Sequence, residues 1–249
     1  MLKDKVAIIT GASSGIGRAT ALLMAREGAK LVLSDLNRDG GEETAQLVRN
    51  QGGEALFAMS DVSRPDDAES LVRQAVQRYT RLDIAVNNAG IGGLTVPTAE
   101  YPVDAWKQVI EINLSGVFYG MKSQITAMLQ SGGGAIVNVS SILGSVGFAT
   151  APAYTAAKHG VVGLTRTSAL EYSASGVRIN AVGPAFIHTP MIQKFERDPA
   201  VNATLIAAHP IGRVGQPEEV AELIAWLSSD RASFITGAYY PVDGGYLAR

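Results

Sequence analysis

Tyr154 and Lys158 have the clearest capacity for chemistry in this sequence, because they stand four residues apart in a segment of helical character. Side chains at that spacing lie on one face of a helix, one turn apart. A tyrosine phenol has an ordinary pKa of about 10, and a neighbouring ammonium group favours the phenolate and lowers that pKa. The pair is therefore predicted to transfer a proton. The same spacing also fits an ordinary surface pair, so the interpretation depends on the rest of the chain.

Ser141 is a third side chain with catalytic potential, thirteen residues before Tyr154. It follows the apolar run 135–139, which is typical of a buried strand. Open parallel sheets bind their ligands at the carboxyl ends of the strands. The sequence therefore predicts Ser141 at the ligand-binding edge of a sheet.

The glycine-rich segment TGASSGIG, residues 10–17, lies between a short apolar strand pattern, 6–9, and a helix predicted over 18–27. Glycines let the backbone approach a phosphate, and a helix N-terminus supplies free N–H groups and a partial positive charge. The spacing is G-x-x-x-G-x-G rather than the common G-x-G-x-x-G, so its place in the first strand-to-helix turn carries the prediction. We expect a pyrophosphate site here.

Asp35 ends the next predicted strand, 30–34, some 24 residues after Gly11. A carboxylate at this position can accept a hydrogen bond from the ribose 2′-hydroxyl of NAD, and it would repel the 2′-phosphate of NADP. Leu36 follows where an arginine would suit NADP, and Arg38 is the nearby cation in the sequence that would argue otherwise. The pattern predicts NAD. Alternatively, Asp35 only begins a turn.

Two further strand ends carry small or polar residues. Asp61 and Val62 follow a short strand predicted over 54–58 and are expected beside the adenine, although Asp61 could instead cap a turn. The segment NNAG, residues 87–90, follows the strand predicted over 82–86 and could hold the middle of a cofactor closely or form an ordinary turn.

Length and composition favour one α/β domain over residues 1–249. The 21 Lys and Arg residues nearly balance the 23 Asp and Glu residues, and no basic run suggests nucleic acid or an anionic membrane as partner. There is no cysteine, and the three histidines show no metal-ligand spacing, so we expect no metal. No apolar run is long enough to span a bilayer, and a strand pattern begins by Val6, so a cytoplasmic protein is expected.

Together, TGASSGIG at 10–17, NNAG at 87–90, Asn113, Ser141 and the Tyr154-x-x-x-Lys158 pair resemble a classical short-chain dehydrogenase/reductase. The resemblance runs from Val6 to Gly245. It implies a Rossmann-like, doubly wound sheet of seven parallel strands with helices on both faces, a nicotinamide cofactor and a homotetramer.

The resemblance also assigns roles. Tyr154 would be the general acid/base, Lys158 would lower its pKa and hold the ribose hydroxyls, and Ser141 would polarise the carbonyl. Asn113 would bend its helix and hold a water that connects Lys158 to solvent, although a locally bonded helix amide is the alternative. Ile187 would offer backbone groups, and Thr189 its hydroxyl, to the nicotinamide carboxamide side of the cofactor. The predicted cofactor-binding residues are Gly11, Ser13, Ser14, Gly15, Ile16, Gly17, Asp35, Leu36, Asp61, Val62, Asn87, Ala89, Gly90, Tyr154, Lys158, Pro184, Ile187 and Thr189.

The chain departs from the family pattern at Ala185, where the family usually has glycine after proline. Alanine resists a positive φ, which puts the local backbone angle in question. Residues of about 188–212 resemble the variable substrate lid, which would be mobile until ligand binds. The predicted substrate pocket is mostly apolar and comprises Ile91, Leu94, Ser141, Ile142, Phe148, Phe186, Met191 and Phe195. Such a pocket suits an uncharged cyclic, aromatic or steroid-like alcohol.

The sequence thus predicts an NAD-dependent oxidoreductase that transfers a hydride between nicotinamide C4 and a secondary alcohol or ketone. One alternative is an NADPH-dependent 3-ketoacyl-(acyl carrier protein) reductase; Asp35 and the lack of arginines at 131–134 and 175–176 count against it. Glucose and other sugar dehydrogenases remain a further alternative, although a sugar pocket should be more polar. A non-catalytic NAD-sensing protein would not need Asn113, Ser141, Tyr154 and Lys158 together.

Overall fold

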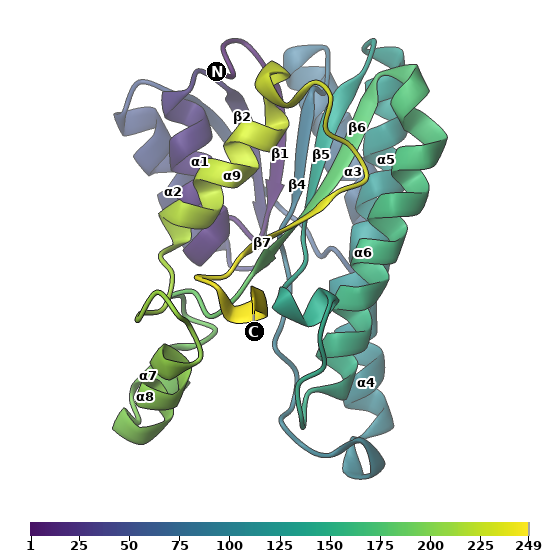
Figure 1. Ribbon diagram of the computed structural model, residues 1–249. Coiled ribbons are helices and arrows are strands. Elements are labelled where there is room, and N and C mark those ends of the chain that lie inside the picture. The colour runs from purple at the N-terminus through teal and green to yellow at the C-terminus, as the bar shows by residue number, and fades with distance from the viewer. Residues whose placement is uncertain (249) are drawn as a thin grey trace.

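A seven-stranded parallel sheet forms the centre of the molecule (Figure 1). The computed structural model describes residues 1–248. The strands are β1 (Val6–Thr10), β2 (Lys30–Asp35), β3 (Glu54–Met59), β4 (Ile84–Asn87), β5 (Gly134–Val139), β6 (Val177–Pro184) and β7 (Tyr239–Val242). Their order in the sheet is β3-β2-β1-β4-β5-β6-β7, which confirms the predicted doubly wound fold. The order reverses between β1 and β4, and such a switch point creates a ligand crevice at the carboxyl ends of the strands.

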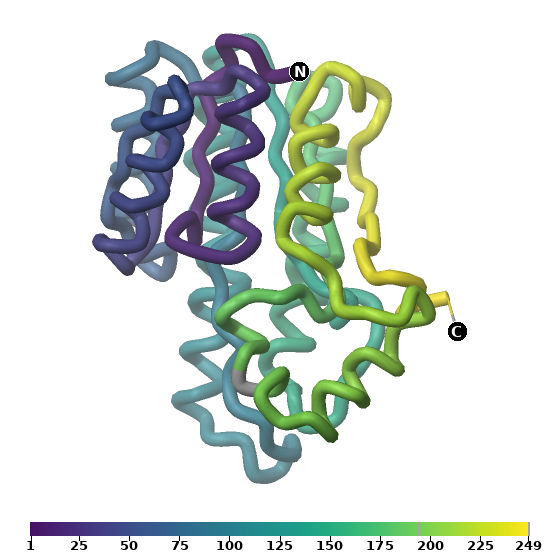
Figure 2. Tube along the Cα trace, turned by 90° about the vertical axis from the view of Figure 1, so that its left-hand side faces the viewer, coloured from purple at the N-terminus to yellow at the C-terminus, as the bar shows by residue number. Residues whose placement is uncertain are grey.

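Helices cover both faces of the sheet (Figure 1). The α-helices are α1 (Gly15–Arg26), α2 (Arg38–Asn50), α3 (Pro65–Tyr79), α4 (Val103–Ile110), α5 (Gly116–Gln130), α6 (Pro152–Tyr172), α7 (Gln193–Glu196), α8 (Pro199–Ala207) and α9 (Pro217–Ser228). Helices α1, α2 and α9 share one apolar cluster with the sheet, whereas α3, α5 and α6 share the other. Figure 2 shows α1 and α9 side by side on their face.

The alternating directions of strand side chains explain how one short apolar run serves both layers. In β1, which is buried throughout, Ala7 and Ile9 belong to the cluster beneath α1 and α9. Val6 and Ile8 belong to the cluster beneath α3 and α5. Successive strand side chains point to opposite faces, so a strand covered on both faces needs a continuous apolar run.

Several element boundaries differ from the sequence prediction. Helix α1 begins at Gly15 rather than at residue 18, so the glycine-rich segment forms its first turn. Helix α2 begins at Arg38 because the side chain of Asn37 caps it, accepting a hydrogen bond from the Gly40 N–H. The last strand, β7, covers only 239–242. The predicted lid, about 188–212, contains the short helices α7 and α8, which extend beyond the carboxyl ends of the strands (Figures 1 and 2).

Within residues 1–248, no helix combines the length and the apolar character that a membrane crossing requires. No group of three or more His, Cys, Asp or Glu side chains in the same residues is arranged to hold a metal ion.

Candidate active site

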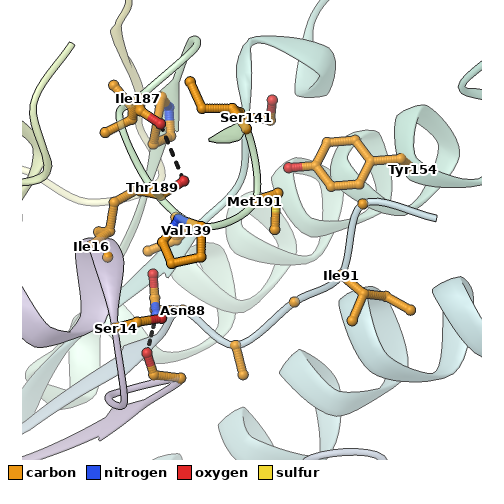
Figure 3. A pocket seen from close by; sticks show the side chains of 18 of the residues that line it. Ser14, Ile16, Asn88, Ile91, Val139, Ser141, Tyr154, Ile187, Thr189 and Met191 are labelled. Atoms are coloured by element: carbon orange, nitrogen blue, oxygen red, sulfur yellow. Dashed lines mark hydrogen bonds between the residues drawn. The ribbon is translucent and has the colours of Figure 1, made fainter. Parts of the chain in front are cut away.

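A cavity of about 570 Å³ opens at the carboxyl ends of the central strands (Figure 3). Its wall brings together the glycine-rich turn after β1, Asp35 at the end of β2, the NNAG segment after β4, Ser141 after β5 and the start of α6. The segment after β6 closes the remaining side with Ile187, Thr189 and Met191. The cavity therefore gathers most of the predicted site residues from segments far apart in the sequence.

The glycine-rich turn forms a cradle that side chains would fill. Gly11 and Gly15 have φ of +65° and +52°, which L-residues rarely adopt. A Cβ atom on Gly17 would lie 2.1 Å from the Gly11 carbonyl oxygen, so Gly17 supports the turn although it does not line the cavity. Ser14 caps α1 without a side-chain hydrogen bond, and the first turn holds no acidic residue. Free N–H groups and the positive end of the helix dipole thus fit a pyrophosphate.

One residue of the NNAG segment, Asn87, does not reach the main cavity as predicted. Asn87 is buried away from the main cavity, where its side chain donates to Gln124 and Asn138. Asn88, which was not predicted, lines the cavity, and its Nδ2 donates to the carbonyl oxygens of Thr10 and Gly11. Ala89 and Gly90 line the cavity as predicted. Adjacent residues leave a strand in opposite directions, so only one asparagine could face the cavity.

Asp35 stands at the rim of the cavity with an ordered carboxylate. Its Oδ2 accepts from the Ser13 N–H at 3.0 Å, and its Oδ1 accepts from the Asn37 N–H at 2.9 Å. Leu36, Asp61 and Val62 join Asp35 around an adjoining cavity of about 180 Å³. Asp61 also caps a turn, because its Oδ1 accepts from the Ser63 N–H. The structure thus groups these four predicted residues at one end of the site.

Arg18 is a cation near this rim that was not predicted. It lies one helical turn after Ser14, and its Nη2 donates to the Ser13 carbonyl at 2.6 Å and to Glu43 at 2.5 Å. Its Nε donates to the Thr44 hydroxyl. The guanidinium is therefore occupied in joining α1 to α2. Arg38, by contrast, points to solvent.

Ser141 has a hydroxyl prepared to donate. The Leu143 N–H donates to its Oγ at 3.2 Å, which occupies an acceptor position and leaves the hydroxyl hydrogen for a partner in the cavity. Figure 3 shows the Tyr154 hydroxyl directed into the pocket, and the Ser141 hydroxyl is close enough to interact with it. A ligand oxygen between them could interact with both hydroxyl groups.

Lys158 is buried on the same face of α6 as Tyr154, as the spacing predicted. Its Nζ donates to the Val139 carbonyl at 2.8 Å and lies 5.5 Å from the centre of the Tyr154 ring. Burial lowers the pKa of Lys158 to about 8. The ammonium group still carries most of its charge at pH 7.

The pKa of Tyr154 differs from the sequence prediction. Burial raises this pKa above its usual value, and the interaction with the Ser141 hydroxyl opposes the rise. The predicted lowering by Lys158 is not found; the ammonium group bonds the Val139 carbonyl and lies over the Tyr154 ring.

Asn113 lies in a π-helical turn, Glu111–Ser115, which joins α4 to α5. Its fully buried side chain pairs with one distant residue: Oδ1 accepts from the Ile91 N–H and Nδ2 donates to the Ile91 carbonyl, both at 2.8 Å. A Cβ on Gly90 would lie 3.1 Å from Asn113 Oδ1 and 3.7 Å from Lys158 Nζ. Asn113 therefore holds the loop beside Lys158, and the alternative of a purely local helix bond is wrong.

The segment after β6 forms one side of the cavity. Pro184, Ile187 and Thr189 line the cavity, and the Thr189 hydroxyl donates to the Ile187 carbonyl at 3.1 Å (Figure 3). Ala185 does not have a positive φ, so the alanine causes no backbone strain. Its N–H donates to the Val242 carbonyl at 3.2 Å.

Only part of the predicted substrate pocket lines the cavity. Ile91, Ser141 and Met191 line the cavity, together with Gly92, Gly93, Pro190 and Ile192, which were not predicted. The other predicted pocket residues, Leu94, Ile142, Phe148, Phe186 and Phe195, lie outside this lining.

These five side chains have different surroundings. Ile142 begins the short helical turn after Ser141 and is buried in the core. Leu94 and Phe148 are exposed. Phe186 packs edge-on against Phe148, His209 and Tyr246 beside a smaller cavity of about 70 Å³. Phe195 lies on α7 within the predicted lid.

Comparison with known proteins agrees with this geometry. A family model described as enoyl-(acyl carrier protein) reductase matches residues 11–247. The chain is 46% identical over 246 residues to a cyclohexanol dehydrogenase of Acinetobacter sp. (strain SE19), covering 99% of this chain and 96% of that protein.

Two further proteins are similar over nearly their full length. The chain is 48% identical over 245 residues to a cis-4-hydroxycyclohexanecarboxylate dehydrogenase of Sinomonas cyclohexanicum, covering 98% of this chain and 97% of that protein. The solved structure of a carveol dehydrogenase from Mycobacterium avium in complex with NAD has a TM-score of 0.96 at 31% identity, covering 100% of this chain and 99% of that one.

Proposed function

Because this chain belongs to the short-chain dehydrogenase/reductase family, we propose that it is an NAD-dependent dehydrogenase of cyclic secondary alcohols. Family membership makes it an oxidoreductase that uses a nicotinamide cofactor and acts on alcohols or the corresponding ketones. One observation carries the proposal. Ser141, Tyr154 and Lys158 meet on the wall of a cavity that also contains the glycine cradle and Asp35.

In the proposed reaction, the bound nicotinamide supplies the hydride acceptor or donor at its C4. During alcohol oxidation, Tyr154 removes the hydroxyl proton of the substrate, and Ser141 donates a hydrogen bond to the same oxygen. Both side chains point into the cavity from neighbouring positions (Figure 3). General acid–base help of this kind contributes about 10²–10⁴-fold to the rate.

Lys158 would hold the cofactor ribose. An ammonium group has three hydrogens, and the Val139 carbonyl takes one, so two are available for ribose hydroxyls. Asn113 would keep the Ile91 loop in place beside Lys158, where the proposed water path to solvent begins.

The choice of NAD rests on the charges around the adenosine end of the cavity. The Asp35 carboxylate would accept from a ribose hydroxyl and repel a 2′-phosphate. Arg18 could attract a phosphate, but Glu43 already neutralises it. The similar carveol dehydrogenase holds NAD in its solved structure.

The substrate class rests on the cavity wall near Ser141. Ile91, Met191 and Ile192 supply apolar surface there, and within residues 1–248 Asp35 and Lys158 are the sole charged side chains of the lining. Such a wall suits an uncharged ring. The relatives at 46% and 48% identity are named for a cyclohexanol and a hydroxycyclohexane carboxylate.

A second candidate is a 3-oxoacyl-(acyl carrier protein) reductase, because the chain is also 39% identical over 248 residues to a protein of that name from Thermotoga maritima. Such an enzyme that uses NADPH would have to accommodate a 2′-phosphate next to Asp35. The two candidates therefore predict opposite cofactor preferences.

The test is turnover of purified protein, followed by the absorbance of the reduced nicotinamide. NAD and NADP are each combined with cyclohexanol, cis-4-hydroxycyclohexanecarboxylate, an acyclic secondary alcohol and xylitol; NADH and NADPH are combined with a 3-ketoacyl thioester. We expect oxidation of the cyclic alcohols with NAD. Preferential reduction of the 3-keto group of the thioester with NADPH would establish the second candidate instead.

Two variants on α6 test the mechanism. Tyr154→Phe should lower kcat by about 10²–10⁴-fold because the proton acceptor is removed. Tyr172→Phe removes a hydroxyl at the far end of the same helix and should leave kcat unchanged. Equal activity of Tyr154→Phe and the wild type would refute the proposed mechanism, and a protein that binds NAD without oxidising any alcohol would be a sensor.

We also propose a homotetramer assembled from copies of this chain. Large apolar side chains are exposed on its helical faces, including Leu170 on α6, which is 89% exposed, and Phe118 on α5. Exposed apolar side chains of this size are ones that an interface between subunits would cover. Light scattering after size exclusion should give a mass near four times 26.1 kDa, and a monomeric mass would exclude the assembly.

A further inference from the structure

We propose that Tyr239 is a positioning residue for Ser141 and acts through the Ser141 backbone. The inference rests on the proposed function, because Ser141 is taken as the hydrogen-bond donor to the substrate oxygen. Tyr239 begins β7 at the edge of the sheet and stands 98 residues after Ser141. Its hydroxyl donates to the Ser141 carbonyl at 2.7 Å.

The Ser141 carbonyl accepts hydrogen bonds that hold the turn, and this turn sets the direction of the Ser141 hydroxyl. Within the turn, the Gly144 N–H donates to this carbonyl at 2.8 Å, and the Leu143 N–H donates to Ser141 Oγ at 3.2 Å. Before it, the Ser140 N–H donates to the Val182 carbonyl at 2.8 Å. Tyr239 supplies the hydrogen bond that ties the carbonyl to a different element of the fold.

The neighbouring strand leaves room for this contact. A Cβ atom on Gly183 would lie 2.1 Å from the Tyr239 hydroxyl oxygen and 2.4 Å from its Cζ. Gly183 pairs with Pro241 in the register of β6 and β7, two residues beyond Tyr239. Any larger residue at position 183 would push the phenol away from Ser141, so the glycine and the tyrosine act as a pair.

Loss of the Tyr239 hydroxyl would let the Ser141 peptide rotate. The turn would keep its internal bonds, but the direction of the Ser141 hydroxyl relative to Tyr154 would be less well defined. Because this hydroxyl donates to the substrate oxygen and interacts with the Tyr154 phenol, the chemical step would suffer. Cofactor binding would not, since Tyr239 does not line the cavity.

Tyr240 provides a matched control on the same strand. Its side chain points to the other face of the sheet and packs against the apolar cluster beneath α1 and α9. Between residues 1 and 248, no hydrogen bond of its hydroxyl is found. Tyr239→Phe and Tyr240→Phe therefore each remove one hydroxyl from β7, but only the first removes a contact with Ser141.

The activity test compares both variants with the wild type on the cyclic alcohol that it oxidises. We expect Tyr239→Phe to lower kcat about three- to tenfold, the size of one weakened hydrogen bond, with an unchanged KM for NAD. The acid limb of kcat/KM should move to higher pH, because Ser141 lowers the pKa of Tyr154 and a displaced Ser141 lowers it less. Tyr240→Phe should match the wild type in all three quantities.

A second measurement does not need turnover. In protein labelled with carbon-13 at tyrosine Cζ, the Tyr154 resonance is identified by its loss in Tyr154→Phe, and Ser141→Ala shows how it shifts without the serine hydroxyl. Tyr239→Phe should shift the resonance in the direction of Ser141→Ala, and Tyr240→Phe should not. A Tyr154 resonance that is the same in Tyr239→Phe and the wild type would overturn the inference; a protein with the shift but no alcohol turnover would instead contradict the proposed function.

Discussion

Burial of the Lys158 ammonium should make the stability of the protein depend on pH in a measurable way. The side chain is 3% exposed, and burial lowers its pKa from the ordinary 10.5 to about 8. The unfolded chain therefore binds this proton more tightly than the folded chain. Stability from this group is fully present above pH 10.5 and is lost as the pH falls through 8.

The size of the effect follows from the two pKa values. A difference of about 2.5 units corresponds to roughly 3 kcal/mol across the full transition. Between pH 7 and pH 10, linkage gives a rise of about 2.5 kcal/mol in the free energy of unfolding. Tyr154 has a raised pKa, so its effect near pH 10, where the unfolded phenol begins to ionise, has the opposite sign; this effect is common to the wild type and to a variant at position 158 and cancels in their difference.

Lys158→Met isolates this contribution, because methionine has a similar shape and no charge. The Val139 carbonyl loses its partner in the variant, but that cost does not depend on pH. The free energy of unfolding is measured by urea denaturation at fixed protein concentration and several pH values from 7 to 10. We expect the value for the wild type minus that for Lys158→Met to rise by about 2.5 kcal/mol over this interval.

Lys122→Met on α5 is the control, because the ammonium of this exposed lysine is solvated in the folded and unfolded chain alike. The free energy of unfolding of the wild type minus that of Lys122→Met should not change with pH. A wild-type minus Lys158→Met difference that is equally flat would refute the reasoning, since it would mean that burial does not disfavour the charged form of Lys158.

Three further substitutions test the cofactor cradle and its supports. Asp35→Ser should weaken the binding of NAD and strengthen the binding of NADP. The ratio of kcat/KM with NADP to kcat/KM with NAD should rise by about tenfold or more, which corresponds to roughly 1.4 kcal/mol. An unchanged ratio would exclude Asp35 as the residue that selects the cofactor. Gly17→Ala would place a Cβ 2.1 Å from the Gly11 carbonyl oxygen and should lower the free energy of unfolding by about 1–3 kcal/mol. The affinity for NAD, measured by calorimetric titration, should also fall. An affinity equal to that of the wild type would show that the glycine-rich turn can widen. Asn113→Ala leaves both backbone groups of Ile91 without their buried partner and should cost about 2–4 kcal/mol in urea denaturation, and a cost below about 0.5 kcal/mol would contradict the role of this amide in holding the loop.

Local patterns in the sequence were sufficient to predict most of the helices and strands and the group formed by Ser141, Tyr154 and Lys158. The apolar run at 6–9 identified a strand covered on both faces, and the four-residue spacing placed Tyr154 and Lys158 on one side of α6. The glycines after β1 identified the cradle, since steric conflicts at Gly11 and Gly17 exclude other residues. These features depend on the backbone near each residue, which nearby residues largely specify.

Side-chain direction was predicted less well where two neighbours competed for the same role. Asn87 and Asn88 are chemically identical, and the register of β4 between β1 and β5 decides that Asn88 faces the cavity. Ile142 is apolar like the cavity wall, yet it follows Ser141 and points into the core. A shift of one residue reverses the side on which a strand residue lies, and composition does not reveal that shift.

By itself, the sequence determined the order of the strands and helices along the chain, the glycine cradle, the carboxylate at Asp35 and the reactive trio of Ser141, Tyr154 and Lys158. Tertiary structure alone decided the partners of those groups: the Val139 carbonyl for Lys158, Ile91 for Asn113 and Tyr239 for Ser141. The reason is that short-range spacing fixes the periodicity of a segment, whereas a hydrogen bond between residues 98 positions apart depends on how separate strands pack into one sheet.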